Sequence, residues 1–217
     1  MCIRDRPTTN ATITGKPLTI TANADAKTYG AVKVYGPNRM EFGTDGGDLV
    51  SGDDVTSVTL ACTDGGPATA VVGSYAIIPS AAVGTGLDNY LIHYQAGALT
   101  VGARGLNLTA NADSKTYGAV KPYGPGQTAF SPGTGELVNG DRVNSVTLAS
   151  SDGGPATAVV GSYHLSSSAA VGTGLANYAI HYHDGALTVT SKSLNYSQRG
   201  LQGLRRGQAV RAGPGGV

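Results

Sequence analysis

Four aspartates between residues 45 and 54 form the densest group of side chains able to bind a metal ion, namely Asp45, Asp48, Asp53 and Asp54. Several carboxylates in one loop suit a hard cation such as Ca²⁺. In the matching stretch 88 residues later, however, Gly133 replaces Asp45 and Arg142 replaces Asp54. We therefore predict no metal site and expect a solvated loop, in which Asp53 or Asp141 caps a turn that forms at most a single helical turn.

The histidines and serines offer no pattern that is typical of catalysis. His93 and His181 occupy matching places in the two halves of the chain, whereas His164 and His183 occur once, and no second histidine or cysteine lies at metal-ligand spacing. Ser162 lies in Gly-Ser-Tyr, no aspartate is placed to pair with a histidine for nucleophilic catalysis, and no glycine-rich segment carries Gly-Lys-Ser/Thr. The sequence thus predicts no catalytic, cofactor-binding or metal-binding residues, no cofactor and no enzyme.

Composition excludes two classes of partner. Only 13% of the 217 residues are charged and the net charge is +1, so the chain lacks the basic surface that binds nucleic acid. Its apolar residues come in short runs, well below the roughly 18 consecutive positions that a membrane span requires, and we expect no membrane insertion. The two cysteines, Cys2 and Cys62, are too few for a disulfide framework, and Ser150 stands in the place that matches Cys62.

The sequence repeats itself at an offset of 88 residues. Residues 18–101 align without a gap on residues 106–189, and 58 of the 84 aligned positions are identical. Only residues 102–105 separate the two copies, and we assign them to a short linker. So short a connection predicts two domains arranged end to end with limited freedom to bend.

The ends of the chain depart from the repeat. We interpret residues 1–10 as a spurious or disordered N-terminus and residues 11–17, which align with the end of repeat 1, as the final strand of an upstream repeat. Residues 190–217 are expected to form a disordered tail. From residue 195 the tail can be read, with permitted codons shifted by one nucleotide, as Ile-Thr-Ala-Asn-Ala-Asp-Ser-Lys, the opening of a frameshifted third repeat. The coding nucleotide sequence tests this hypothesis.

Alternation of apolar and polar residues predicts strands in each copy, which in the first are residues 18–22, 57–61, 70–78 with an interruption at Gly73, 89–94 and 98–101. The last two strands resemble a hairpin whose loop, at residues 95–97, uses Gly97 for its positive φ. Five tyrosines recur per copy and tryptophan is absent, so we expect tyrosine to be the large residue of a thin core. The predicted class is all-β, with two tandem small β-sandwich or β-grasp-like domains.

The recurring segments resemble the MBG domain of the YGX type over the whole of both copies. In the first copy they are Leu18–Asn23, Lys27–Gly30, Leu49–Asp53, Val72–Tyr75, Asn89–Tyr94 and Gly97–Val101. Val34 departs from the proline that stands at Pro122. The resemblance implies a tandem array in a secreted or surface-attached bacterial protein, often a filamentous-haemagglutinin-like adhesin, and it supplies no catalytic residues. We interpret the recurring Tyr-Gly as a packed ring beside a backbone that needs glycine.

Two functions remain open at this point. A stalk or spacer holds a distant module away from the cell, has neighbouring repeats as its only partners and tolerates near-identical copies. A binding module engages a host glycan or surface protein weakly at each repeat and gains affinity through multivalency. Residues 38–48 differ most from their counterparts, so this surface loop is the first place to look for selectivity.

Overall fold

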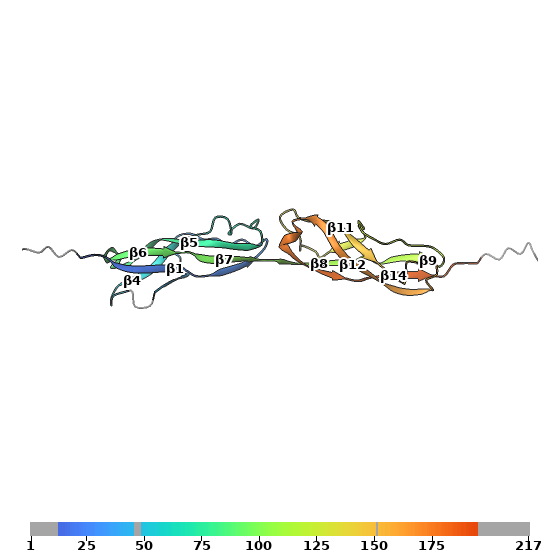
Figure 1. Ribbon diagram of the computed structural model, residues 1–217, viewed down its shortest axis with the longest axis horizontal. Coiled ribbons are helices and arrows are strands. Elements are labelled where there is room, and N and C mark those ends of the chain that lie inside the picture. Colours follow the sequence, from blue (N-terminus) through green and yellow to red (C-terminus); the bar gives the residue numbers. More distant parts are fainter. Residues whose placement is uncertain (1–12, 46–48, 151, 195–217) are drawn as a thin grey trace, which may run out of the picture.

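The protein is an all-β chain of two tandem units that lie end to end, with the first and last described segments at opposite ends of the long axis (Figure 1). This computed structural model describes residues 13–45, 49–150 and 152–194. Within those ranges there is no α-helix, and each unit has a single 3-10 turn. The predicted all-β class and the tandem arrangement of two repeats are confirmed.

Both units are built from the same elements in the same order. Repeat 1 contains β1 (Lys16–Ala22), β2 (Asp25–Thr28), β3 (Phe42–Thr44), β4 (Asp54–Ala61), β5 (Gly73–Thr85), η1 (Leu87–Asn89), β6 (Tyr90–Gln95) and β7 (Gly97–Gly102). Repeat 2 contains β8 (Arg104–Ala110), β9 (Asp113–Thr116), β10 (Phe130–Pro132), β11 (Arg142–Ala149), β12 (Gly161–Thr173), η2 (Leu175–Asn177), β13 (Tyr178–His183) and β14 (Gly185–Thr190). Every element of repeat 2 begins and ends 88 residues after its counterpart.

Each repeat consists of two sheets. In repeat 1 a three-stranded sheet has the order β3-β1-β6 and a four-stranded sheet has the order β2-β7-β5-β4. The pairs β1–β6 and β2–β7 are parallel, while β1–β3, β5–β7 and β4–β5 are antiparallel. Repeat 2 reproduces this order with β10-β8-β13 and β11-β12-β14-β9. No strand pair among the described residues crosses from one repeat to the other.

The core between the two sheets is aliphatic rather than tyrosine-based. Leu18 and Ile20 of β1 pack with Ile77 of β5 and Leu99 of β7, and each of the four is almost fully buried. These side chains alternate with exposed ones along their strands, as the sequence pattern indicates. The expectation that tyrosine is the large core residue is wrong for the centre of the domain, because the tyrosine rings lie at its ends and edges, where their hydroxyls reach polar partners.

A β-bulge recurs in the longest strand of each repeat. Ala81 in β5 and Ala169 in β12 have positive φ values of 45° and 46°, and the register with the neighbouring strand shifts nearby. The amide of Ala82, next to the bulge, donates to the hydroxyl of Tyr94 on β6 at 2.8 Å. This bond links the four-stranded sheet to the three-stranded one, and Tyr182 makes it again in repeat 2.

The predicted hairpin at residues 95–97 is wrong. β6 pairs with β1 in one sheet and β7 pairs with β2 and β5 in the other, so the short connection between them crosses between layers. Gly97 is not among the residues with positive φ. Its lack of a side chain is needed because a Cβ atom there would collide with the backbone carbonyl of Ala22. The strand expected at residues 70–78 begins at Gly73 and extends to Thr85.

The described strands also change the expected boundaries. Of the linker at residues 102–105, Gly102 ends β7 and Arg104 begins β8, which leaves Ala103 alone between the strands of the two repeats. Residues 16 and 17, expected in an upstream strand, belong to β1 because they pair with β6. Thr190, expected in the tail, ends β14. The spurious N-terminus and the frameshifted segment from residue 195 lie outside the described residues.

The core predicts a large cost for truncating a buried leucine. Leu99 is fully buried between the sheets of repeat 1, so Leu99→Ala removes three buried carbon atoms and opens a cavity. We expect the free energy of unfolding of repeat 1 to fall by about 2–5 kcal/mol. Chemical denaturation of the full chain, followed through amide signals of each repeat, measures it. A loss below about 1 kcal/mol would contradict the assigned core.

Candidate functional site: the joint between the repeats

Only part of the acidic cluster at residues 45–54 lies in the described part of the chain. There, no group of three or more His, Cys, Asp or Glu residues is placed to hold a metal ion, and Asp48 lies outside the described residues. Asp53 instead accepts a hydrogen bond from the hydroxyl of Tyr90 at 2.7 Å. Both Asp53 and its counterpart Asp141 are half-buried rather than solvated.

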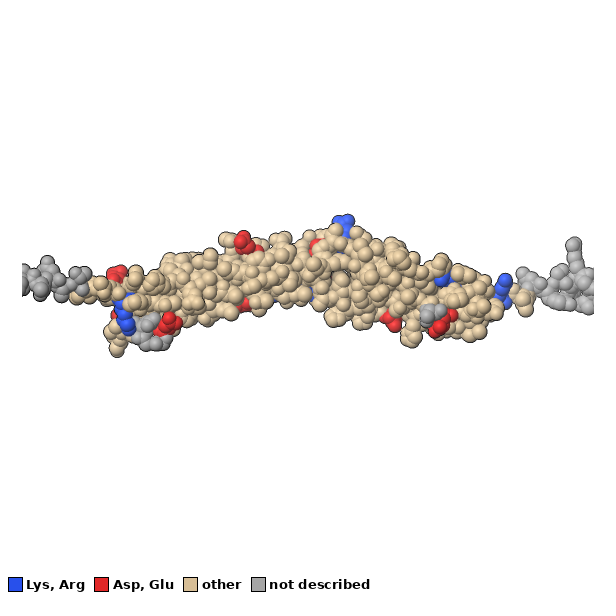
Figure 2. Space-filling model, viewed as in Figure 1, with Lys and Arg blue, Asp and Glu red and all other residues tan. Residues whose placement is uncertain are grey.

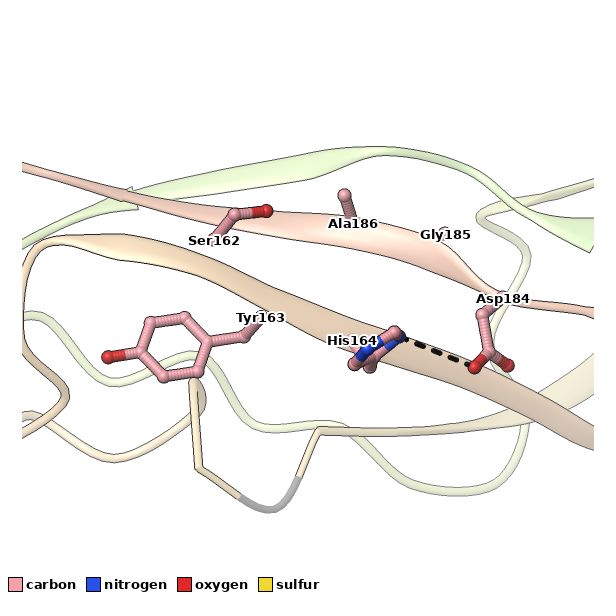
Figure 3. Close-up of a pocket in the computed structure, with 6 residues that line it drawn as sticks. All are labelled: Ser162, Tyr163, His164, Asp184, Gly185 and Ala186. Atoms are coloured by element: carbon pink, nitrogen blue, oxygen red, sulfur yellow. Dashed lines mark ion pairs between the residues drawn. The ribbon is translucent and has the colours of Figure 1, made fainter.

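One histidine and one aspartate come together in repeat 2. Nδ1 of His164 lies 3.6 Å from Oδ2 of Asp184, and Ser162 shares the same shallow pocket (Figure 3). The two segments meet because β12 pairs with β14, which places His164 opposite Ala186. The spacing in the sequence did not reveal that this aspartate and this histidine lie side by side.

This trio lacks the features of a nucleophilic site. No hydrogen bond joins Ser162 to His164 among those of the described residues, and 93% of the His164 side chain is exposed, so water screens its pairing with Asp184. Repeat 1 has Ala76 and Ala96 at the positions of the histidine and the aspartate. The remaining histidines, including His93 and His181, are exposed on β6 and β13.

The two repeats meet at a joint that combines polar and apolar contacts. We define it by Tyr29, Gly30, Ala68 and Val72 of repeat 1 and by Val138, Asn139, Asp141, Asn177 and Tyr178 of repeat 2. The ring of Tyr29 packs edge-on against that of Tyr178, with 5.5 Å between centroids and 80° between planes. Tyr29 is only 4% exposed. The apolar cluster of repeat 2 thus continues into the joint through Tyr29 and Ala70, although each repeat keeps its own two sheets.

Asp141 connects the two tyrosines of the joint. Its Oδ2 accepts hydrogen bonds from the hydroxyl of Tyr29 at 2.9 Å and from that of Tyr178 at 3.0 Å. The Tyr178 oxygen in turn accepts from the amide of Val138 at 3.0 Å. Burial raises the pKa of Tyr178, which keeps its hydroxyl protonated and able to donate at physiological pH. One carboxylate oxygen therefore receives a donor from each repeat.

Three further contacts fix the orientation of the repeats. The side-chain amide of Asn139 donates to the carbonyl of Ala68 at 2.9 Å, and the amide of Val72 donates to Oδ1 of Asn177 at 3.0 Å. Gly30 has a φ of 84° and lies against Val138, so that a Cβ atom on it would come within 2.7 Å of the valine Cγ2. Bonds at separate points of the contact, together with close packing, restrict rotation as well as separation.

A buried lysine holds the loops that repeat 1 contributes to the joint. Lys27, 8% exposed, donates from Nζ to the carbonyls of Ala31 and Gly66, each at 3.0 Å, and to that of Pro67. Burial lowers the pKa of the Lys27 ammonium. These acceptors flank Gly30 and Ala68, so the ammonium group ties together the two segments that contact repeat 2. Lys115 has the same arrangement with Ala119, Gly154 and Pro155.

The sequence analysis did not find the joint. It interpreted Tyr29-Gly30 as a packed ring beside a backbone that needs glycine, and the ring is indeed packed and the glycine required, but against the neighbouring repeat. The available signal was the strict recurrence of Tyr-Gly together with a linker too short to separate the domains. Which surface of the next repeat the ring meets depends on the direction in which β8 leaves β7, which the residue pattern does not encode.

Comparison with known families now identifies the repeats. The MBG domain (YGX type) matches residues 18–100 and again residues 106–188. The chain belongs to this family. The match confirms the resemblance that the sequence analysis based on its recurring segments. MBG repeats form a non-enzymatic repeat family found in surface adhesin-like proteins. No curated protein is significantly similar to the chain. None of the helices among the described residues has the length and apolar character needed to cross a membrane.

Replacing the buried lysine tests how the loops of the joint are held. Lys27→Met keeps the length of the side chain but leaves the carbonyls of Ala31 and Pro67 without this donor. We expect a loss of about 1–3 kcal/mol in the stability of repeat 1 and greater access of solvent to Tyr29, measured by denaturation and by tyrosine nitration. Lys115→Met, the control in repeat 2, should cost similar stability while leaving Tyr29 protected. Equal nitration of Tyr29 in both variants would contradict the assignment.

Matched glycine variants test the joint itself. Gly30 and Gly118 have φ values of 84° and 88°, so alanine at either site carries a similar backbone cost of about 1–2 kcal/mol. Only at Gly30 does the new methyl group meet the next repeat, because nothing lies within 4 Å of a Cβ atom at Gly118. We expect Gly30→Ala to loosen the relative orientation of the repeats, measured by residual dipolar couplings, and Gly118→Ala to leave it unchanged. The same orientation in both variants would show that Gly30 is not part of a close contact.

Proposed function

We propose that this chain is a non-catalytic length of stalk in a secreted or cell-surface bacterial adhesin. In this role the repeats hold a module located elsewhere in the protein at a distance from the cell. Their partners are the neighbouring repeats of the same chain. Nucleic acid and the membrane are not partners of this segment, in keeping with its low content of charged residues.

The observation that carries the proposal is the packed joint at the connection between the two repeats. A stalk gains reach from each added repeat only if successive repeats stay aligned. Alignment is favoured by the contacts of Tyr29 with Tyr178 and Asp141 and by the single residue Ala103 between the strands of the two repeats. The first and last described segments also lie at opposite ends of the long axis (Figure 1). The face in Figure 2 carries only scattered charged residues, with no broad patch of one sign.

The alternative is a binding module for a host glycan or surface protein. One polar depression in repeat 1 favours it, because Arg39 and Glu41, from the variable segment, line it together with Asp25, Lys33 and Tyr35. Lys33 holds the pKa of Asp25 below its ordinary value. In repeat 2, Gln127 and Ala129 take the places of Arg39 and Glu41. A site that changes its charged residues between adjacent copies does not provide multivalent binding, so we favour the stalk.

The test combines the shape of the full chain with its binding. We expect small-angle X-ray scattering to give an elongated particle with two aligned lobes, and we expect neither a glycan array nor host cells to retain the protein. A compact particle would contradict the stalk. The alternative would be favoured if the wild type binds, Arg39→Ala abolishes the binding, and the matched control Gln127→Ala leaves it intact. Antibody labelling of intact bacteria that express the gene tests exposure on the surface.

A further inference from the structure

The outer end of repeat 2 carries the same side chains that repeat 1 uses in the joint. We infer that this end, defined here as the C-terminal face and formed by Tyr117, Gly118, Ala156 and Val160, is a docking surface for the opposite end of another repeat of this type. The inference rests on the proposed stalk function and names the surface through which a further repeat attaches. Its occupant is the region equivalent to Val138, Asp141, Asn177 and Tyr178.

The C-terminal face matches the joint residue for residue. At the 88-residue offset, Tyr117-Gly118 repeats Tyr29-Gly30, and Ala156 and Val160 repeat Ala68 and Val72, with no substitution. Gly118 keeps its positive φ, and open space surrounds the place of its missing Cβ atom. The gap that Val138 fills beside Gly30 is therefore present and free beside Gly118.

The residues of the C-terminal face are more exposed to solvent than the identical residues that repeat 1 contributes to the joint. Tyr29 is 4% exposed in the joint, whereas Tyr117 is 46% exposed at the free end. Val160 is more exposed than Val72 as well, at 58% against 40%. A tyrosine that is nearly half exposed, beside exposed valine and glycine, is an apolar surface that burial in a joint stabilises.

The other end of the chain carries the complementary half. Val50, Asp53, Asn89 and Tyr90 are the counterparts of the four residues that repeat 2 contributes, and we define them as the N-terminal face. Asn89 is exposed although Asn177 is buried in the joint, and Val50 is 56% exposed although Val138 is half-buried. Each repeat therefore has one face of each kind, and in this chain one of each faces solvent in the described structure.

The free faces already have the internal geometry of the joint. The hydroxyl of Tyr90 donates to Asp53 at 2.7 Å and accepts from the amide of Val50 at 2.8 Å, as Tyr178 does with Asp141 and Val138. At the opposite end, Nζ of Lys115 holds the loops beside Gly118 and Ala156 through the carbonyls of Ala119 and Gly154. A preorganised surface loses little conformational entropy when its partner docks, which favours association.

Only one residue of the joint changes between copies. Ser51 stands where Asn139 donates to Ala68, so a joint made by the N-terminal face of repeat 1 would lack that hydrogen bond. A repeat that carries asparagine at this place makes the complete set of contacts. The contact is heterologous, between two different faces. Because these faces lie at opposite ends of a repeat, repeats joined in this way continue along a line.

The experiment adds a third repeat to the full chain by duplicating residues 102–189 directly after Val189. The added N-terminal face is then identical to the one already present in the joint, and the C-terminal face of repeat 2 acquires a neighbour. Nitration of each tyrosine, followed by peptide mass spectrometry, reports its exposure. We expect the reactivity of Tyr117 to fall about tenfold in the three-repeat chain, to the level of Tyr29, in proportion to their exposed fractions. Tyr182, which is 38% exposed and outside the joint, should stay reactive in both chains.

One variant and one folding control sharpen the outcome. Gly118→Ala has no neighbour to meet in the two-repeat chain, but in the three-repeat chain we expect it to restore the reactivity of Tyr117. Dispersed amide signals from the added repeat show that it has folded. If Tyr117 stays as reactive in the folded three-repeat chain as in the original, the inference is overturned. That result would be distinct from failure of the stalk function, which the scattering and binding experiments report.

Discussion

The contact on which the structure depends is a half-buried carboxylate that receives a hydroxyl donor from each repeat. Asp141 accepts from Tyr29 across the joint and from Tyr178 within its own repeat, and the two rings pack edge to face above it. A carboxylate removed from water without donors is costly, so each hydroxyl stabilises the position of the other. The loops behind Tyr29 are fixed in turn by Lys27, which links the stability of repeat 1 to the geometry of the joint.

This constraint explains where the two copies agree and where they differ. In an array joined as we infer, each repeat presents one face to the repeat before it and a different face to the repeat after it, so substitutions at either end affect a contact. Among the joint residues and their counterparts, only Ser51 and Asn139 differ. The largest difference lies in residues 38–48, whose described part includes the edge strand β3 and the chain leading to it.

The sequence predicted the repeat, the all-β class and the places of most strands. Strands are predicted by the local alternation of apolar and polar residues, and the repeat is found by comparing the sequence with itself at an offset of 88 residues. It did not predict which strands pair. The hairpin at residues 95–97 failed since a short loop fits a change of sheet as well as a turn, and the parallel pair β1–β6 joins segments separated by most of the repeat. The proximity of His164 to Asp184 and the contact of Tyr29 with Tyr178 arise from sheet pairing and domain orientation, and neither is encoded in spacing.

Tension and bending act on different parts of this chain. A pull along the axis passes through the covalent backbone at Ala103 and into β7 and β8, which run lengthwise and load several ladder hydrogen bonds together (Figure 1). The non-covalent contacts of the joint therefore add little to tensile strength, and their effect is on angle. With free hinges the end-to-end distance of an array grows only as about the square root of the number of repeats, whereas with fixed joints it grows in proportion to that number. The contact between Tyr29 and Asp141 thus converts added repeats into added length.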